Sequence, residues 1–336
     1  MNHEDVSTPE TETSASSEQA NATYQLIDHF RQELSKAIIG QQSVIEQVLI
    51  GLFANGHVLI EGVPGLGKTL LVRALARCFN GQFSRIQFTP DLMPSDVTGH
   101  VIYDMKSSQF TLRKGPIFTH LLLADEINRA PAKTQSALLE VMQENQVTIE
   151  GKPLKVPTPF MTLATQNPLE QEGTYPLPEA QLDRFLLKVL IDYPTETEEQ
   201  QLVSHVTNGH VGDQLNVDQI TPFLSPEDVT KIQKQCARIQ VDSEVNAYAV
   251  RIIRATREWQ GISVGAGPRG AISLIRAARA TALLAGRDFV SPDDVKSIAL
   301  PALRHRISLS PELELEGHDT DHVLAAVLAS VEAPRK

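Results

Sequence analysis

The chain has 336 residues, enough for about two domains, and its 41% apolar content is ordinary for a globular protein with a sizeable core. No apolar stretch approaches the ~20 residues that span a bilayer, and the N-terminus lacks the basic-then-apolar pattern of a secretion signal. We therefore expect a cytoplasmic protein without a membrane segment. The formal net charge of −11 argues against a general nucleic-acid binder, although it does not exclude a local basic patch. Cys78 and Cys236 lie in separate predicted helices and predict core thiols, not a disulfide framework or a metal cluster.

The first 20 residues are rich in Ser, Thr and Glu and have no apolar period, which predicts a disordered tail. A helix follows, in which Leu26, Ile27, Phe30 and Leu34 recur at helical spacing. From residue 57 onward, strand and helix patterns alternate, which predicts a parallel sheet covered by helices. The expected strands are residues 57–61, 83–88, 120–125, 160–166 and 186–191.

Two pairs of short apolar runs interrupt this alternation, and each pair flanks a polar turn that is typical of a β-hairpin. The first pair is 101–103 with 110–112, and the second is 147–149 with 154–156. After Pro194 the pattern becomes helical, which predicts a small all-α domain that follows a linker. Capping boxes or near variants mark the expected helix starts at residues 195–198, 225–228 and 291–294.

The most informative stretch runs from Gly62 to Thr69 and reads Gly62-Val63-Pro64-Gly65-Leu66-Gly67-Lys68-Thr69. An apolar strand precedes it, and a helical pattern that begins with Leu70 follows it, which is the context that a phosphate-binding P-loop requires. Glycines let backbone N–H groups turn toward an anion, and the helix N-terminus adds its positive dipole end. Lys68 is placed to reach the β- and γ-phosphates, and the Thr69 hydroxyl is placed to ligate Mg²⁺.

Two further strands end in polar residues. The buried run Leu121–Ala124 ends in Asp125 and Glu126, and packing explains two carboxylates there poorly, because Asp and Glu are seldom buried unless paired. In P-loop enzymes the first acid supports Mg²⁺, and the second is placed to orient or deprotonate an attacking water. Asn167 follows the strand 160–166; before Pro168 it is also a common turn former, but after the two preceding motifs we expect it to hold the nucleophilic water.

This order of motifs resembles that of the AAA+ ATPases. The sequence segments around the motifs resemble the MoxR family in particular, and the resemblance extends from about residue 22 to the end. The resemblance implies an α/β fold: an AAA+ P-loop domain with a parallel five-stranded sheet and β-hairpin inserts at residues 21–194, then a small all-α lid domain with its linker at residues 195–336. It implies ATP and Mg²⁺ as cofactors. The phrases that carry it are Ile39-Gly40-Gln41, Phe88 to Asp96, Gly115 to Phe118, Ala124 to Pro131, Ala164 to Pro168, Leu177 to Phe185 and Gly267-Pro268-Arg269.

Further site residues follow from the resemblance alone. Ile39 and Gly40 are expected near the adenine. Arg184 is expected to be an arginine finger inserted into the neighbouring subunit's site, and Arg269 a nucleotide contact within its own subunit, while Arg129 is a third candidate at the interface. A finger that acts in trans requires a ring, by resemblance a hexamer. One departure from the family pattern is Gly267, where a Ser is more common; either residue suits a helix N-cap.

Two classes of function remain. The first is an ATP-driven remodeller that matures or activates protein complexes, which resembles MoxR-family chaperones that act with von Willebrand factor A-domain partners. The second is a DNA-directed AAA+ motor. Magnesium-chelatase ATPase subunits, which share the fold and the inserts, are a close third. The acidic balance and the lack of a recognisable nucleic-acid module favour a protein partner over DNA. Lys152 and Lys155 in the second hairpin keep the DNA-directed alternative open.

Overall fold

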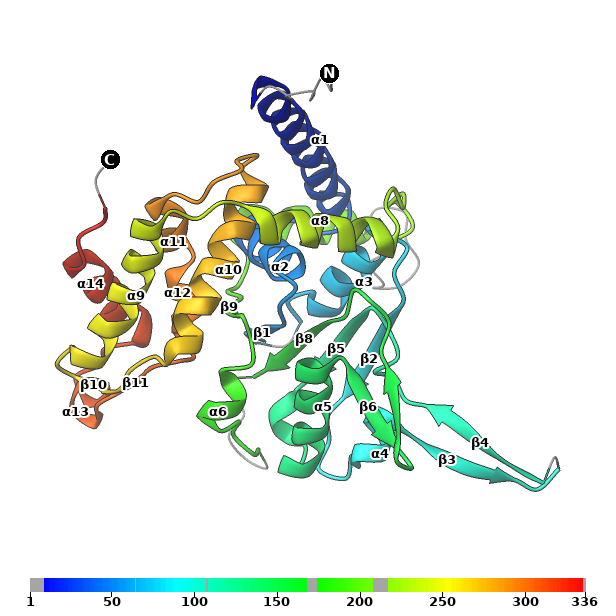
Figure 1. Ribbon diagram of the computed structural model, residues 1–336. Coiled ribbons are helices and arrows are strands. Elements are labelled where there is room, and N and C mark those ends of the chain that lie inside the picture. The colour runs from blue at the N-terminus through cyan, green and yellow to red at the C-terminus, as the bar shows by residue number, and fades with distance from the viewer. Residues whose placement is uncertain (1–8, 64, 107, 168–173, 208–216, 335–336) are drawn as a thin grey trace, which may run out of the picture.

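The protein is described by a computed structural model over residues 9–63, 65–106, 108–167, 174–207 and 217–334. Its centre is a five-stranded sheet in which every pairing is parallel, with the strand order β2-β5-β8-β1-β9 (Figure 1). All five predicted strands are confirmed to within one residue at either end. The strands are β1 (Val58–Glu61), β2 (Phe83–Gln87), β5 (Leu121–Asp125), β8 (Met161–Gln166) and β9 (Leu187–Leu190).

Both faces of the sheet are covered, and the central strands β1, β5 and β8 supply side chains to two separate apolar clusters. In β5, Leu121 and Leu123 join the larger cluster, whereas Leu122 and Ala124 join the smaller one. This division follows from the two-residue period of a strand, and it explains why the central strands read as continuous apolar runs. The helices of this part are α1 (Pro9–Ser35), α2 (Gln42–Phe53), α3 (Lys68–Cys78), α4 (Pro94–Thr98), α5 (Ala132–Glu144), α6 (Glu179–Leu182) and α7 (Glu196–Thr207).

The N-terminal helix differs from the expectation. Helix α1 begins at Pro9, so residues 9–20 of the predicted disordered tail are helical in the structure and continue the amphipathic segment after them. Pro at a first helical position and the nearby Ala, Glu and Gln residues all tolerate or favour a helix, although they supply no apolar period by which to recognise one. Figure 1 shows the first turns of α1 projecting from the body of the molecule.

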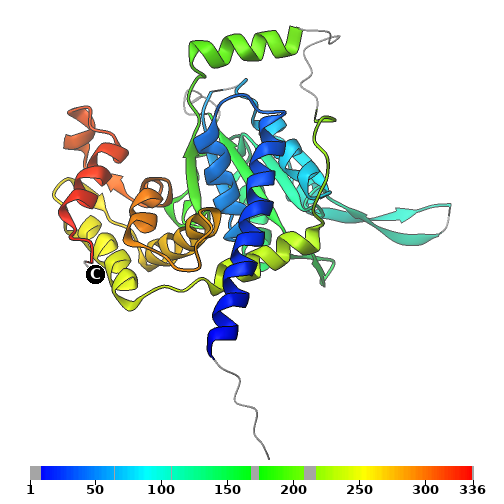
Figure 2. The same cartoon turned by 90° about the horizontal axis from the view of Figure 1, so that it is seen from above.

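Both predicted hairpins are confirmed. Strands β3 (Gly99–Asp104) and β4 (Gln109–Lys114) pair in antiparallel fashion, as do β6 (Gln146–Ile149) and β7 (Lys152–Lys155). The β3–β4 hairpin extends well beyond the sheet in both views (Figures 1 and 2). No helix among the described residues has the length and apolarity needed to cross a membrane.

The C-terminal part is a helical lid, as predicted, although it is not purely helical. A short antiparallel ladder joins β10 (Ile262–Val264) to β11 (Ser308–Leu309). The larger apolar cluster runs without a break from α1, α2 and β9 into α8, α9, α10 and α12, so the lid and the sheet domain share one core. The lid helices are α8 (Pro226–Arg238), α9 (Ser243–Glu258), α10 (Pro268–Leu284), α11 (Pro292–Ser297), α12 (Ala299–Leu303), α13 (Pro311–Leu315) and α14 (Thr320–Ser330).

Candidate active site

The P-loop joins the carboxyl end of β1 to the first turn of α3. Gly65 and Gly67 have φ angles of +88° and +73°, a region that residues with a side chain rarely adopt. A Cβ atom added to either glycine would meet no atom within 4 Å, so the loop surrounds an open cradle of the kind that receives phosphate. At Gly62 a glycine is required by lack of space, because a Cβ atom there would lie 2.6 Å from the carbonyl oxygen of Ile191.

Lys68 lies at the start of α3, and its ammonium group donates a hydrogen bond back to the carbonyl oxygen of Gly62. Burial lowers the pKa of Lys68, while the negative charges of Asp125, Glu126 and Glu61 act in the opposite direction. The ammonium group is thus held inside the loop and faces the acidic side of the site. This arrangement suits a lysine that exchanges a backbone contact for phosphate oxygens.

Asp125 ends β5 and has partners on both sides. Arg85 in β2 donates to its Oδ2 at 2.6 Å from Nη2 and at 3.1 Å from Nε, and the Thr165 hydroxyl in β8 donates to its Oδ1 at 2.6 Å. Neither Arg85 nor Thr165 was predicted from the sequence. Their side chains reach Asp125 only because β2 and β8 flank β5 in the sheet.

Glu126 follows β5 with a left-handed backbone, φ +56°, which turns its side chain out of the strand direction. Gln87 donates to its Oε2 at 2.7 Å, and Arg129 forms an ion pair with the same oxygen at 3.2 Å. The backbone N–H of Glu126 donates to Thr165 at 2.8 Å. Arg129, considered for the subunit interface, therefore contacts the acidic residue of its own chain.

The strand order of the sheet also places Asn167 near the P-loop and the acid pair. Strand β8 lies between β1 and β5, so the residue after β8 lies between the P-loop and the acid pair. Glu61 pairs in register with Gln166, and the N–H of Gly62 donates to the carbonyl oxygen of Gln166 at 3.4 Å. Asn167 is 8% exposed. The three neighbouring strands thus bring Asn167, the P-loop and the acid pair to the same edge of the sheet.

The Ile39-Gly40-Gln41 turn adjoins the P-loop. Gly40 and Gln41 both have left-handed backbones, and the Gln41 amide donates to the carbonyl oxygen of Leu66 at 3.2 Å. Ile39 is half-buried next to them. The remaining predicted nucleotide-binding residues lie in the loop and the first turn of α3, except for Pro64, which is outside the described residues; they are Val63, Leu66, Thr69 and Leu70.

The ligands near the P-loop suit Mg²⁺. The Thr69 hydroxyl and the Asp125 carboxylate are hard oxygen donors, and Mg²⁺ in phosphate sites takes one or two protein ligands together with water and phosphate oxygens. Within the described part of the chain, no group of three or more His, Cys, Asp or Glu side chains is gathered as for a fully protein-ligated metal. The donor set therefore fits a metal that arrives with the nucleotide.

Arg184 and Arg269 lie elsewhere. They line one cavity of about 350 Å³ together with Arg276 and with Asn55 and Gly56, which precede β1. The P-loop follows β1, so the cavity and the P-loop are at opposite ends of a four-residue strand, ~13 Å along its axis at the usual rise. The contact between Arg269 and nucleotide in its own chain, expected by resemblance, does not fit this arrangement, because the lid docks on the side of β9 and α2.

Both arginines remain suited to an anion from outside the chain. The buried Nε of Arg184 has no hydrogen-bond partner among the described residues. Arg269 is exposed, and its Nη1 lies 3.7 Å from Asp183 Oδ2. A buried unpaired donor and an exposed guanidinium thus line the same cavity.

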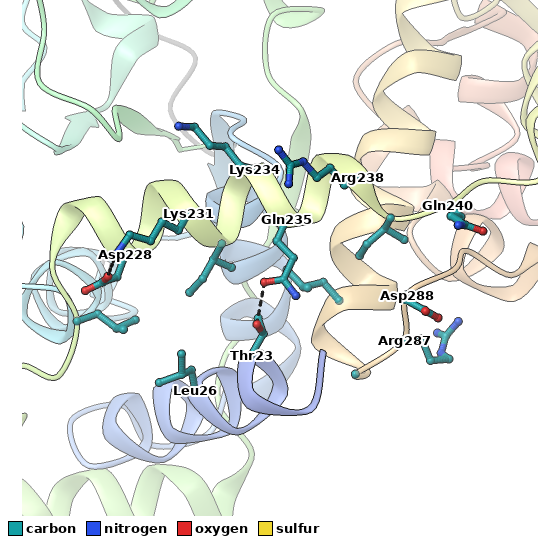
Figure 3. A pocket seen from close by; sticks show the side chains of 15 residues that line it. Thr23, Leu26, Asp228, Lys231, Lys234, Gln235, Arg238, Gln240, Arg287 and Asp288 are labelled. Carbon is teal, nitrogen blue, oxygen red and sulfur yellow. Dashed lines mark hydrogen bonds and ion pairs between the residues drawn. The ribbon is translucent and has the colours of Figure 1, made fainter. Parts of the chain in front are cut away.

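A second cavity, of about 610 Å³, lies between α1, α8 and the loop after α10 (Figure 3). Four of its polar side chains form two contacting pairs. Lys231 lies 2.8 Å from Asp228, and Thr23 donates to Gln235 at 2.8 Å. This cavity is therefore a seam between the N-terminal helix and the lid, and it shares no residue with the P-loop or the acid pair.

The fold and the site define a P-loop ATPase of the AAA class. Residues 57–187 match the family described as "ATPase family associated with various cellular activities (AAA)", and residues 254–327 match the AAA lid domain. The lid match covers the region that the structure builds from α9 to α14. The chain therefore binds nucleotide and is an ATP-hydrolysing enzyme.

Similar proteins narrow the class. The chaperone MoxR1 of Mycobacterium tuberculosis is 43% identical over 90% of this chain and 81% of its own length. Protein YeaC of Bacillus subtilis is 44% identical over 90% of this chain and 93% of its own length. A crystal structure of a provisionally assigned ATPase from Cytophaga hutchinsonii is 41% identical, with a TM-score of 0.89, and covers 96% of this chain and 99% of that one. The chain belongs to the MoxR family of AAA+ ATPases.

Proposed function

We propose that this enzyme uses ATP hydrolysis to remodel, mature or activate protein complexes, and that it works with a von Willebrand factor A-domain protein. The observation that carries the proposal is the β3–β4 hairpin, which presents apolar side chains to solvent away from the ATP site. Tyr103, Met105 and Phe110 are 53%, 86% and 77% exposed. Exposed apolar groups on a projecting element favour a protein surface as the partner. The family resemblance supports the A-domain partner.

The proposed roles follow from the contacts of the chain. Lys68 and the cradle of Gly65 and Gly67 bind the phosphates, and Thr69 and Asp125 would hold Mg²⁺, which would supply positive charge to the phosphates. Glu126 takes a proton from the attacking water, and Asn167 orients that water. In the structure Gln87 and Arg129 both contact Glu126 Oε2, and neither contact uses Oε1, the other oxygen of the carboxylate.

Arg184 and Arg269 complete the site of a neighbouring subunit in this proposal. The cavity that they line is at the end of β1 opposite the P-loop, so one subunit can offer its arginines to the P-loop of the next. Repeating such a head-to-tail contact closes a ring when the rotation allows it, and a hexamer is the expected number. Positive charge from the neighbour would offset charge on the transferring phosphoryl group.

Mixing two inactive variants tests the trans contact. Arg184→Ala lacks the finger, and Lys68→Ala lacks the phosphate-binding lysine. In equimolar mixed rings, about a quarter of the interfaces pair an intact P-loop with an intact Arg184 by chance. We therefore expect ATPase activity to reappear on mixing, measured as phosphate release. The trans role is rejected if rings proven to be mixed, by co-purification through a tag on one variant, stay as inactive as the separate variants.

The alternative is a DNA-directed motor. The observation that keeps it open is the β6–β7 hairpin, where Lys152 and Lys155 are both exposed. Two lysines are a small electrostatic footprint in a chain of net charge −11, because DNA binding draws on several phosphate contacts. A magnesium-chelatase-type ATPase subunit, which shares the fold and the inserts, stays a third candidate.

The two hairpins allow a matched comparison between the two functions. Replacing Tyr103, Met105 and Phe110 with serine should abolish binding of a chemically unfolded, reduced model protein. Basal ATPase should stay within about twofold, since the hairpin projects beyond the sheet that carries the site (Figure 1). Replacing Lys152 and Lys155 with serine should change neither property. The protein-directed proposal fails if double-stranded DNA stimulates the ATPase with steep salt dependence and the lysine variant, not the apolar one, loses that stimulation.

A further inference from the structure

The finger segment is held by a buried arginine from the lid. Arg306 follows α12 and is 8% exposed, and its guanidinium reaches across to the residues on both sides of Arg184. It donates to the Asp183 side chain at 2.9 Å, to the Asp183 carbonyl at 3.2 Å and to the Phe185 carbonyl at 2.6 Å. A fourth hydrogen bond reaches the Leu186 carbonyl at 3.3 Å. One side chain thus fixes the backbone immediately before and after Arg184.

The guanidinium is also anchored within the lid. It donates to Ser273 Oγ in α10 at 3.0 Å and to the Ala302 carbonyl in α12. His305 Nε2 lies 3.0 Å from the Phe185 carbonyl, so a second lid residue contacts the same segment. Burial lowers the pKa of Arg306 to about 10, with Asp183 opposing the shift, so the group stays charged at neutral pH.

Asp183 lies beside two of the three arginines that line the cavity, Arg184 and Arg269. Its carboxylate accepts from Arg306 at 2.9 Å and lies 3.7 Å from Arg269, while the next residue is Arg184 itself. A bidentate or multiply bonded guanidinium fixes both position and orientation. The lid therefore fixes the position of the backbone that carries Arg184 and the position of Arg269 beside it.

We propose that Arg306 is a positioning residue for the arginine finger: it ties the lid to the segment Asp183–Leu186, so that the lid sets how Arg184 is offered to the adjoining subunit. This inference rests on the proposed trans role of Arg184. It assigns Arg306 no contact with nucleotide. Its loss should therefore impair the subunit that receives the finger and leave the P-loop of its own chain intact.

The test uses two variants. Arg306→Lys keeps the positive charge but loses the planar guanidinium with its several donors. Asp183→Asn keeps the side-chain shape but loses the negative charge that faces both Arg306 and Arg269. We expect kcat to fall by ~10- to ~100-fold, the scale of a misplaced group, with KM for ATP within about twofold. The matched control is Arg304→Lys. Arg304 is also a lid arginine with an acidic partner, Asp321 at 2.7 Å, but it bonds the Lys188 carbonyl in β9 instead of the finger segment. It should lose stability without losing kcat.

Subunit mixing separates a positioning role from a merely structural one. Mixed with Lys68→Ala, the Arg306→Lys chain should regain activity, because its own P-loop then receives a well-placed Arg184 from the neighbour. A structural defect in its own ATP site would not be rescued, and that outcome overturns the inference. Asp183→Asn provides the same readout if Arg306→Lys does not fold. Failure of the Arg184→Ala mixture would instead reject the trans finger itself, so the two failures are distinguishable.

Discussion

Replacing Glu126 with glutamine is expected to slow ATP hydrolysis by ~10²-fold or more, the usual scale for a lost general base, while ATP binding is retained. The amide keeps the shape of the side chain and an oxygen that can still accept from Gln87, so the local geometry should persist. Single-turnover phosphate release and ATP titration by calorimetry measure the two properties separately.

The control for this variant is Glu140→Gln, which changes an exposed acid on α5, a helix that carries none of the proposed site residues. It should hydrolyse ATP at the normal rate. Because bound ATP persists in Glu126→Gln, assembled rings should also accumulate, which sedimentation can detect. Near-normal turnover in the Glu126 variant would move the base to another residue.

Replacing Lys68 with alanine is expected to abolish detectable ATP binding while the fold remains intact. The ammonium group is half-buried in the P-loop, and no other cation among the described residues is placed inside that loop. Calorimetry gives the affinity, and thermal unfolding confirms that the variant folds.

Arg73→Ala is the matched control, since Arg73 is an exposed cation on the same helix, little more than one turn further along α3. It should change the affinity for ATP by less than about twofold, as is usual for a surface substitution. An unchanged affinity in folded Lys68→Ala would reject the assignment of this loop as the phosphate site.

The sequence predicted those parts of the site whose residues all lie in one continuous stretch of the chain. The strand-loop-helix pattern around Lys68 and the acids after the apolar run that ends at Ala124 are of this kind, and the five strands were found to within one residue at either end. Arg85 and Gln87 could not be found in this way, because their contacts with the acids depend on β2 lying next to β5. Two polar residues spaced by two in an edge strand were the only signal.

The position of the lid on the sheet domain could not be predicted from the sequence either. Arg269 was recognised by the family motif that contains it, but the motif does not state on which side of the sheet its helix docks. That side is decided by apolar contacts of α10 with α2 and of α12 with β9, which connect segments more than 100 residues apart. Helix α1 was underestimated for a related reason, since its first turns carry no apolar face that a periodicity could detect.

The continuous core that joins the lid to the sheet domain has a mechanical consequence. Prising the lid away from α2 and β9 would expose buried apolar side chains to water, at a cost of about 25 cal/mol for each Å² uncovered. Hinging inside one chain is therefore disfavoured, and each chain behaves as a stiff block. In the ring proposed above, we therefore expect the deformable contacts to lie between subunits, so that ATP hydrolysis moves whole subunits relative to one another.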